Sequence, residues 1–228
     1  TDVKLMEVPY ALNADERRFV LIVAAPKMGQ ELGYQVWADL AGGTTYVQTN
    51  DTNDLSAVGQ LAAAYNRVTA TDAGFTIDTL SGGEDILEDV ASNDGWLINI
   101  DDEWLYANGV VDNLDGSMTF SGVTRGVMDT VPSDHADNAK VWIISSGYAD
   151  LTPSEPLEAD GTVRVKLLPF SAGTPLPIAS ATARTLAVTN RAKRPYPPGK
   201  LRIGGSAYPA TASGTRPAER TSRAIRPP

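Results

Sequence analysis

Short apolar runs separated by turn residues fill the stretch from residue 96 to residue 147. These runs are rich in branched and aromatic side chains and comprise Trp96–Ile100, Trp104–Tyr106, Ser117–Phe120 and Lys140–Ile144. Asn108-Gly109 and Asp115-Gly116 lie between them, and such dipeptides indicate β-hairpins because type I′ turns need a positive φ at both central residues. With another turn expected at Val123–Gly126, the stretch predicts a compact all-β module.

Further strands are predicted on both sides of this module, at Val3–Val8, Phe19–Ala25, Gly33–Ala38, Phe75–Asp78 and Thr162–Leu168. Phe19–Ala25 is apolar throughout, so we expect a strand that is buried on both faces. Gly42-Gly43 should turn Gly33–Ala38 into Thr44–Gln48 as a hairpin. Val58–Ala64 fits either a short helix or a strand.

The segment Thr162–Leu168 alternates cleanly between apolar and polar residues, which predicts a half-exposed strand with Val163, Val165 and Leu167 inward. Leu186–Thr189 could close the same sheet. We therefore expect a mainly β protein with two to three small antiparallel sheet or barrel modules and an extended, basic, Pro-rich C-terminal arm. The expected boundaries are 1–75, 76–150, 151–191 and 192–228.

Charge is divided unevenly along the 228 residues. Residues 1–150 carry 24 acidic and 7 basic side chains, whereas residues 151–228 carry 4 acidic and 12 basic ones. The bases near the C-terminus are spread among Pro, Ala and Gly, with Tyr196 and Tyr208 as the aromatic residues. This pattern favours an arm that docks on an acidic neighbour over one that binds nucleic acid, and a disordered arm stays open.

The absence of cysteine excludes disulfides, thiolate metal sites and cysteine nucleophiles. The apolar runs are all shorter than a membrane span, so we expect no transmembrane helix. The chain begins at Thr1, which suggests a processed product or a fragment of a longer protein.

The single histidine, His135, follows Ser133 and Asp134 directly. A catalytic triad needs groups from separate elements, so these neighbours do not predict one. We expect His135 and Asp129 to make hydrogen bonds that fix the irregular loop after Arg125-Gly126. The Arg125 guanidinium should tie this loop together through Asp129 or backbone carbonyls.

Carboxylates cluster in three places, Asp101-Asp102-Glu103, Glu84-Asp85 and Glu88-Asp89. Paired acids can hydrolyse glycosides, but adjacent acids in a strand face opposite sides, so we interpret them as solvated turn residues. The run Asp112–Gly116 offers several oxygens for calcium but lacks the 12-residue loop with a terminal Glu. The four tryptophans, Trp37, Trp96, Trp104 and Trp142, could form a sugar platform, although core packing is the favoured interpretation. We therefore assign no catalytic, cofactor-binding or metal-ligating residue.

The central stretch also resembles a module of tailed-bacteriophage tail-tip and baseplate hub proteins, the central tail hubs of siphophages and gene transfer agents. Ile100–Val110 (IDDEWLYANGV), Gly116–His135 (GSMTFSGVTRGVMDTVPSDH) and Val141–Gly147 (VWIISSG) carry the resemblance. Glu7–Tyr10 and Arg194–Ile203 resemble the same proteins, so the similarity spans roughly residues 3 to 210.

This resemblance implies a structural, non-enzymatic component of the virion at the distal end of the phage tail, made in the cytoplasm of the bacterial host. Such hubs take part in tail assembly, host attachment and DNA delivery. The expected partners are other tail proteins, further copies in a homotrimer around the tail axis, and a bacterial surface receptor. Neither a cofactor nor specific nucleic-acid recognition is expected. A carbohydrate-binding β module and a cell-wall-degrading tail enzyme stay open as alternatives.

Overall fold

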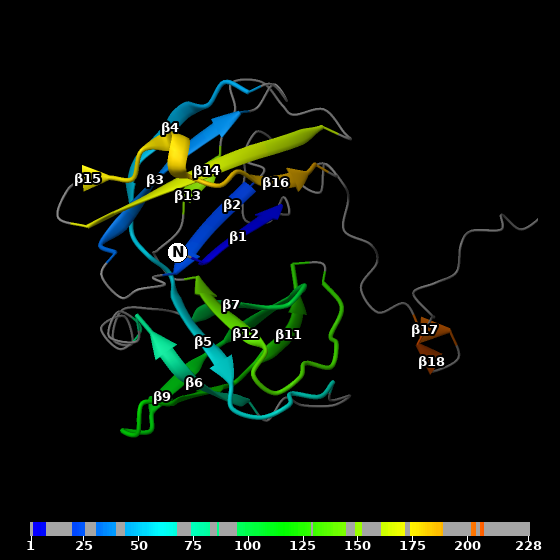
Figure 1. Ribbon diagram of the computed structural model, residues 1–228. Helices are drawn as coiled ribbons and strands as arrows, with labels where there is room; N and C mark the ends of the chain where they lie inside the picture. The colour runs from blue at the N-terminus through cyan, green and yellow to red at the C-terminus, as the bar shows by residue number, and fades with distance from the viewer. Residues whose placement is uncertain are drawn as a thin grey trace, which may run out of the picture. The chain divides into compact units, whose positions relative to one another are not determined.

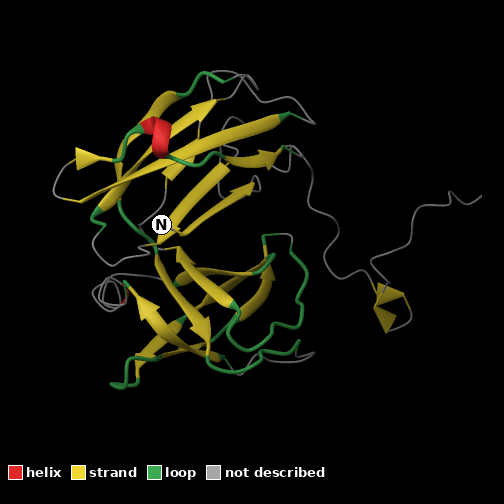
Figure 2. Cartoon of the chain, viewed as in Figure 1, coloured by secondary structure: helices red, strands yellow, loops and turns green. Residues whose placement is uncertain are grey.

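The computed structural model of the chain consists mostly of antiparallel β-strands, as the sequence predicts (Figure 1; Figure 2). It describes residues 2–7, 20–25, 31–39, 44–67, 74–82, 86, 95–128, 130–144, 149–151, 161–171, 174–188, 202–203 and 206–207. The chain divides into two compact units, residues 1–195 and residues 196–228.

Eight strands form the largest sheet, in the spatial order β11-β8-β7-β12-β5-β6-β10-β9. Their bounds are Ala57–Leu61 (β5), Phe75–Ser81 (β6), Trp96–Ile100 (β7), Glu103–Ala107 (β8), Gly109–Asp112 (β9), Met118–Ser121 (β10), Thr124–Val127 (β11) and Lys140–Ile144 (β12). Asn108 alone separates β8 from β9, and its amide donates to the Ser121 carbonyl at 3.1 Å. Because the chain joins β8, near one end of this order, to β9, at the other end, the sheet curls back on itself (Figure 1).

The inner face of the curled sheet holds the larger hydrophobic core. Successive side chains of a strand point to opposite faces, so alternate residues of each strand enter this core. Ile98, Ile100 and Leu105 are fully buried in it, and the rings of Phe75 and Phe120 stack at 5.4 Å. Burial of each such side chain contributes about 1.5–3 kcal/mol, which makes this core the main source of stability for the sheet.

The opposite face of the same sheet is covered as well along β8 and β12. Trp104, Trp142 and Ile144 form a second buried cluster there together with Met6. Met6 belongs to β1 (Asp2–Glu7), the end strand of a three-stranded sheet with the order β1-β2-β13. The N-terminal strand therefore packs directly against the eight-stranded sheet.

The other strands of this small sheet are β2 (Val20–Ala25) and β13 (Ala149–Leu151). The predicted strand Phe19–Ala25 is thus present as β2, paired with β1 on one side and β13 on the other. Burial of both faces of β2 stays a prediction, because the structure does not describe the side chains of this strand.

A five-stranded sheet has the order β15-β14-β3-β4, with β16 also paired to β14. Its bounds are Gly33–Asp39 (β3), Val47–Asn53 (β4), Thr162–Ser171 (β14), Thr174–Pro175 (β15) and Arg184–Ala187 (β16), and the short 3-10 turn η3 spans Ile178–Ser180. Val163, Val165 and Leu167 point inward and are buried, as the alternation predicts. Two residues of the predicted closing segment, Leu186 and Ala187, belong to β16, which pairs with β14.

Two predicted chain reversals are confirmed. β3 and β4 pair antiparallel, with Trp37 opposite Gln48, although Gly42-Gly43 itself lies outside the described residues. The predicted reversal at Asp115-Gly116 is present as well, but the strand that pairs with β10 is β9, which is not among the predicted runs. Their connection is a five-residue loop, Asn113–Ser117, in place of the expected two-residue turn, and the Asn113 amide donates to the Ser117 carbonyl at 3.1 Å.

Two predicted turns are wrong. Asn108-Gly109 does not close a hairpin, because β8 pairs with β7 and β11 whereas β9 pairs with β10. Val123–Gly126 is not a turn, since Thr124–Val127 is strand β11. A register shift after Arg125 makes a bulge at Gly126, which has a φ of 63°. The ambiguous segment Val58–Ala64 contains the end of strand β5 and not a helix.

The five-stranded sheet pairs strands of residues 33–53 with strands of residues 162–187, and β5 belongs to the eight-stranded sheet. The module boundaries at residues 75 and 150 stay predictions. In the second unit, β17 (Arg202–Ile203) and β18 (Ser206–Ala207) pair antiparallel, and the rest of the predicted arm lies outside the described residues. Within the part of the chain that the structure describes, no helix is long and apolar enough to cross a membrane.

Candidate functional site

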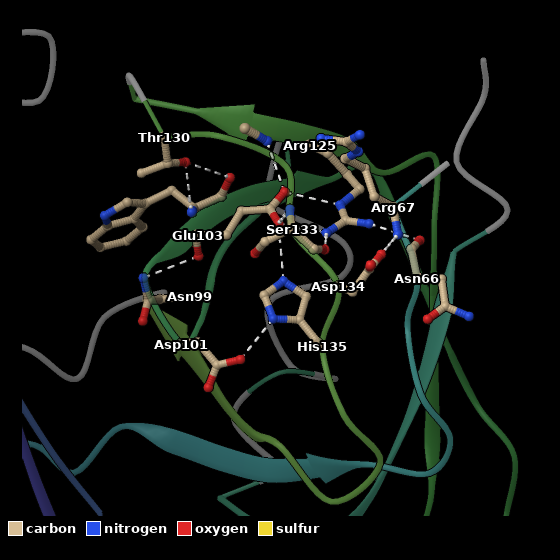
Figure 3. Close-up of polar contacts among 12 residues, drawn as sticks. Asn66, Arg67, Asn99, Asp101, Glu103, Arg125, Thr130, Ser133, Asp134 and His135 are labelled. Atoms are coloured by element: carbon tan, nitrogen blue, oxygen red, sulfur yellow. Dashed lines mark hydrogen bonds and ion pairs between the residues drawn. The ribbon is translucent and has the colours of Figure 1, made fainter. Parts of the chain in front are cut away.

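Charged residues from separate segments meet on the inner face of the eight-stranded sheet (Figure 3). Glu103 begins β8 and shares a face with Leu105, two residues further on. Arg125 of β11 lies opposite Leu105, so its side chain enters the same space. His135 follows β11, and its backbone exchanges two hydrogen bonds with Tyr65, at 2.9 and 3.0 Å.

The Glu103 carboxylate is fully buried and accepts five hydrogen bonds. Its Oε1 accepts from Arg125 Nε at 2.9 Å and from the Gly126 amide at 3.0 Å. Its Oε2 accepts from Arg125 Nη2 at 2.5 Å, from the Ser133 amide at 2.9 Å and from His135 Nε2 at 2.9 Å. One carboxylate therefore joins β11 to the segment that follows it.

The Arg125 guanidinium is 3% exposed and holds Glu103 through two parallel hydrogen bonds. Two further donors bind the backbone carbonyls of Asn66, at 3.0 Å, and Ser133. The guanidinium carbon also lies 4.4 Å from the centre of the Tyr65 ring, within the range of a cation–π contact. Arg125 therefore ties the loop together through backbone carbonyls, as predicted, but its ionic partner is Glu103.

The His135 ring is fully buried between two carboxylates. Nδ1 lies 2.8 Å from Asp101 Oδ2, and Nε2 lies 2.9 Å from Glu103 Oε2. An ionised carboxylate only accepts hydrogen bonds, so each ring nitrogen must carry a proton to make its contact. The geometry therefore calls for a positively charged imidazolium.

The turn between β7 and β8 connects this cluster to the N-terminal strand. Asp101 has a φ of 51°, and its side chain, 59% exposed, reaches His135. Lys4 of β1 donates to the Asp101 carbonyl and to the Asn99 side chain, whose amide in turn donates to the Glu103 carbonyl at 3.1 Å. We refer to Asp101, Glu103, Arg125 and His135 together as the ion cluster.

The two buried titratable groups shift in opposite directions. Burial acts to raise the pKa of Glu103, but the hydrogen bonds from His135, Arg125 and Ser133 outweigh it and lower this pKa to about 2. Burial acts to lower the pKa of His135, but its contacts with Glu103 and Asp101 outweigh it and raise this pKa. Both shifts favour the charged forms.

These charges act on one another within the cluster. Two carboxylates balance one guanidinium and one imidazolium, and both oxygens of Glu103 accept at least two hydrogen bonds. A general base needs a lone pair that faces its substrate, whereas the protonated His135 has none to offer. The arrangement suits a clamp that fixes one loop conformation.

The sequence-adjacent Ser133, Asp134 and His135 play different parts. Ser133 contributes its backbone amide and carbonyl, while Asp134 Oδ1 accepts the Arg67 amide at 2.6 Å. Both ring nitrogens of His135 face carboxylates, so no Ser-His-Asp triad forms. His135 does fix the loop, as predicted, through Asp101 and Glu103. The other predicted participant, Asp129, lies outside the described residues.

The prediction that Asp101-Asp102-Glu103 are solvated turn acids is wrong for Glu103, which is a buried strand residue. Glu84, Asp85, Glu88 and Asp89 lie outside the described residues. In the run Asp112–Gly116, considered above as a calcium alternative, Asp112 and Asp115 each use Oδ1 to accept a backbone amide of their own loop. Across the described part of the chain, no group of three or more acids or histidines is placed to hold a metal ion.

The tryptophans are mostly core residues, as favoured. Trp96, Trp104 and Trp142 are 2%, 2% and 4% exposed, which removes them from any sugar platform. Trp37 is partly exposed on β3, where its indole nitrogen donates to Gln35 at 3.4 Å.

Sequence reasoning missed Glu103 as the centre of the site, although a signal was present. In the run EWLYA, Glu103 lies two residues before Leu105 and four before Ala107. Residues two apart in a strand point to the same face, so Glu103 shares the apolar, core-facing side of the strand with them. An acid on a core face needs a cationic partner, and the nearby motifs supply Arg125 and His135.

No protein-family model matches this chain, and no curated protein matches it either.

Proposed function

We propose that this protein is a structural subunit of the distal end of a bacteriophage tail, a tail-tip or baseplate hub that contributes to tail assembly, host attachment and DNA delivery. Its partners would be other tail proteins, further copies in a trimer around the tail axis, and a bacterial surface receptor. Its place would be the virion.

One observation carries the proposal: the residues that hold the buried ion cluster come from the segments that resemble the hub proteins. Glu103 lies in IDDEWLY, Arg125 lies in the TRG of the second segment, and Ser133 and His135 lie in its PSDH end. The resemblance is thus concentrated in a device that fixes loops. Fixed loops on a β scaffold suit repeated docking between subunits, because they lower the entropy lost on association.

The first test is the mass of the purified chain in solution, measured by light scattering alone and then with candidate tail proteins. We expect about three times the 24.2 kDa of the chain, or a larger complex with a tail protein. Salt should weaken assembly if the acidic residues 1–150 face basic partners.

A variant pair sharpens this test. Glu103→Gln should weaken assembly because it releases the loop, whereas Asp54→Asn, an acid-to-amide change at an exposed position before β5, should not. A chain that stays monomeric with every tail protein would contradict the proposal. Binding on a glycan array, or clearing on a cell-wall zymogram, would then favour the carbohydrate-binding or wall-degrading alternative.

A further inference from the structure

The loop between β9 and β10 displays a leucine in an unfavourable backbone conformation. Leu114 is 89% exposed and has a φ of 62°. Side chains of L-residues avoid this left-handed region because Cβ crowds the following carbonyl. An exposed side chain gains no burial energy that would offset the strain. Within the isolated chain, neither backbone preference nor packing favours leucine at this position.

The polar side chains of the loop hold Leu114 in place. Asp112 Oδ1 accepts the Leu114 amide at 2.8 Å, and Asp115 Oδ1 accepts the Ser117 amide at 3.0 Å and its hydroxyl at 2.6 Å. Asn113 donates from its side chain to the Ser117 hydroxyl at 2.9 Å. The loop is therefore a built turn that presents an apolar side chain to solvent.

Two more features mark this end of the sheet, which we call the tip (residues 111–115). Val111 of β9 is 58% exposed, so the strand before the loop also presents an apolar side chain to solvent. β9 is also the last strand in the sheet order, and no strand that the structure describes pairs with its other edge. Exposed apolar side chains beside an open strand edge are typical of a protein-docking surface.

The charge of the tip points to one partner chemistry. The tip contains two acids, Asp112 and Asp115, and no base, and hydrogen bonds from Ser117 lower the pKa of Asp115, which keeps it anionic. Residues 191–228 of the same sequence contain nine bases and one acid, together with apolar Leu201, Ile203 and Ile225. This segment has the opposite charge and offers side chains that could cover a leucine.

We propose that the tip docks on the basic segment, residues 191–228, of a second copy of the chain. Leu114 supplies the apolar contact, and Asp112 and Asp115 supply the complementary charge. The inference does not rest on the proposed hub function, since it uses only the geometry of the tip and the charge of the chain.

The test compares self-association of full-length variants by sedimentation velocity over a range of concentrations. We expect the wild type to associate at low salt, and a synthetic peptide of residues 191–228 to compete with this association. Leu114→Asn should weaken association about tenfold or more, because it removes the leucine side chain that the proposed interface would bury. Leu32→Asn is the matched control, since Leu32 is 66% exposed and lies just before β3, a strand of the five-stranded sheet.

Thermal unfolding gives an independent readout. Asn adopts the left-handed region more readily than Leu, so Leu114→Asn should raise the unfolding midpoint by about 2–4 °C while it weakens association. A higher unfolding midpoint together with weaker association would show that the strained conformation of Leu114 serves binding. If Leu114 instead stabilised the fold, Leu114→Asn would lower both the unfolding midpoint and the strength of association.

The proposal is overturned if the wild type stays monomeric, if the peptide does not compete, or if Leu114→Asn associates like the wild type. An unfolding midpoint that falls in this variant would overturn it too. A protein that still joins tail proteins while Leu114→Asn has no effect would refute this inference and leave the hub function standing.

Discussion

Replacement of Glu103 by glutamine is the sharpest probe of the ion cluster. The change keeps the shape of the side chain but removes its charge, so Arg125 and His135 remain buried without their shared counterion. Removal of one partner of a buried ion pair costs about 3–5 kcal/mol, because the other charge is left uncompensated. The amide nitrogen of Gln would also face donors where a carboxylate oxygen now accepts up to three hydrogen bonds.

The pKa of Glu103 gives the same magnitude by a separate route. This pKa is about 2 in the folded protein against an ordinary value of 4.5, and each pKa unit corresponds to about 1.4 kcal/mol, so ionisation favours folding by about 3 kcal/mol. Because the folded pKa is the lower one, this stability is present above pH 4.5 and is lost as the pH falls towards 2. In Glu103→Gln that acid-dependent loss should be absent.

The assay is equilibrium unfolding in urea at pH 7 and at several values below pH 4.5. We expect the free energy of unfolding of Glu103→Gln to fall by about 3–5 kcal/mol at pH 7, and that of Asp54→Asn to change by less than about 0.5 kcal/mol. If Glu103→Gln loses less than about 1 kcal/mol, or retains the acid-dependent loss of the wild type, the cluster is not what stabilises this loop.

His135 should make the protein sensitive to alkaline pH: its folded pKa is raised, so its stabilisation is complete below the ordinary value near 6.5 and disappears as the pH rises through the folded value. Urea midpoints from pH 6 to 9 should show this loss in the wild type and not in His135→Gln, and a neutral ring in the folded protein by NMR would contradict it. Gly126→Ala should destabilise the protein by about 2–4 kcal/mol, because φ is 63° and a Cβ would lie 2.6 Å from Pro132 Cδ. Gly116→Ala, with a φ of 89° and open space around it, should cost only about 1–2 kcal/mol in the same assay, and equal losses would argue against the steric reason.

Segments with a strong local pattern could be predicted from the sequence. β12 spans the predicted residues Lys140–Ile144, and the inward residues of β14 follow from strict alternation. Both predictions depend on the two-residue period of a strand, which is a property of the backbone and does not require knowledge of the fold.

Turn dipeptides were less decisive, for a physical reason. Asn108-Gly109 and Asp115-Gly116 carry the same signal, but only the second lies in a loop that reverses the chain. Such residues tolerate positive φ, which permits a reversal without requiring one. Near Asn108 the polypeptide passes from β8 to β9 along the curled sheet, and that path depends on which strands lie on either side.

The candidate site shows where the sequence alone could decide and where it could not. The alternation of side chains along β8 places Glu103 on the core face. Arg125 and His135 are residue types that can neutralise its charge. Their meeting depends on tertiary structure, since they lie 22 and 32 residues further along the chain and reach Glu103 through the β8–β11 pairing and the bridge from His135 to Tyr65. The charge of His135 follows from that meeting, because the two carboxylates that face the imidazole raise its pKa above the ordinary value near 6.5.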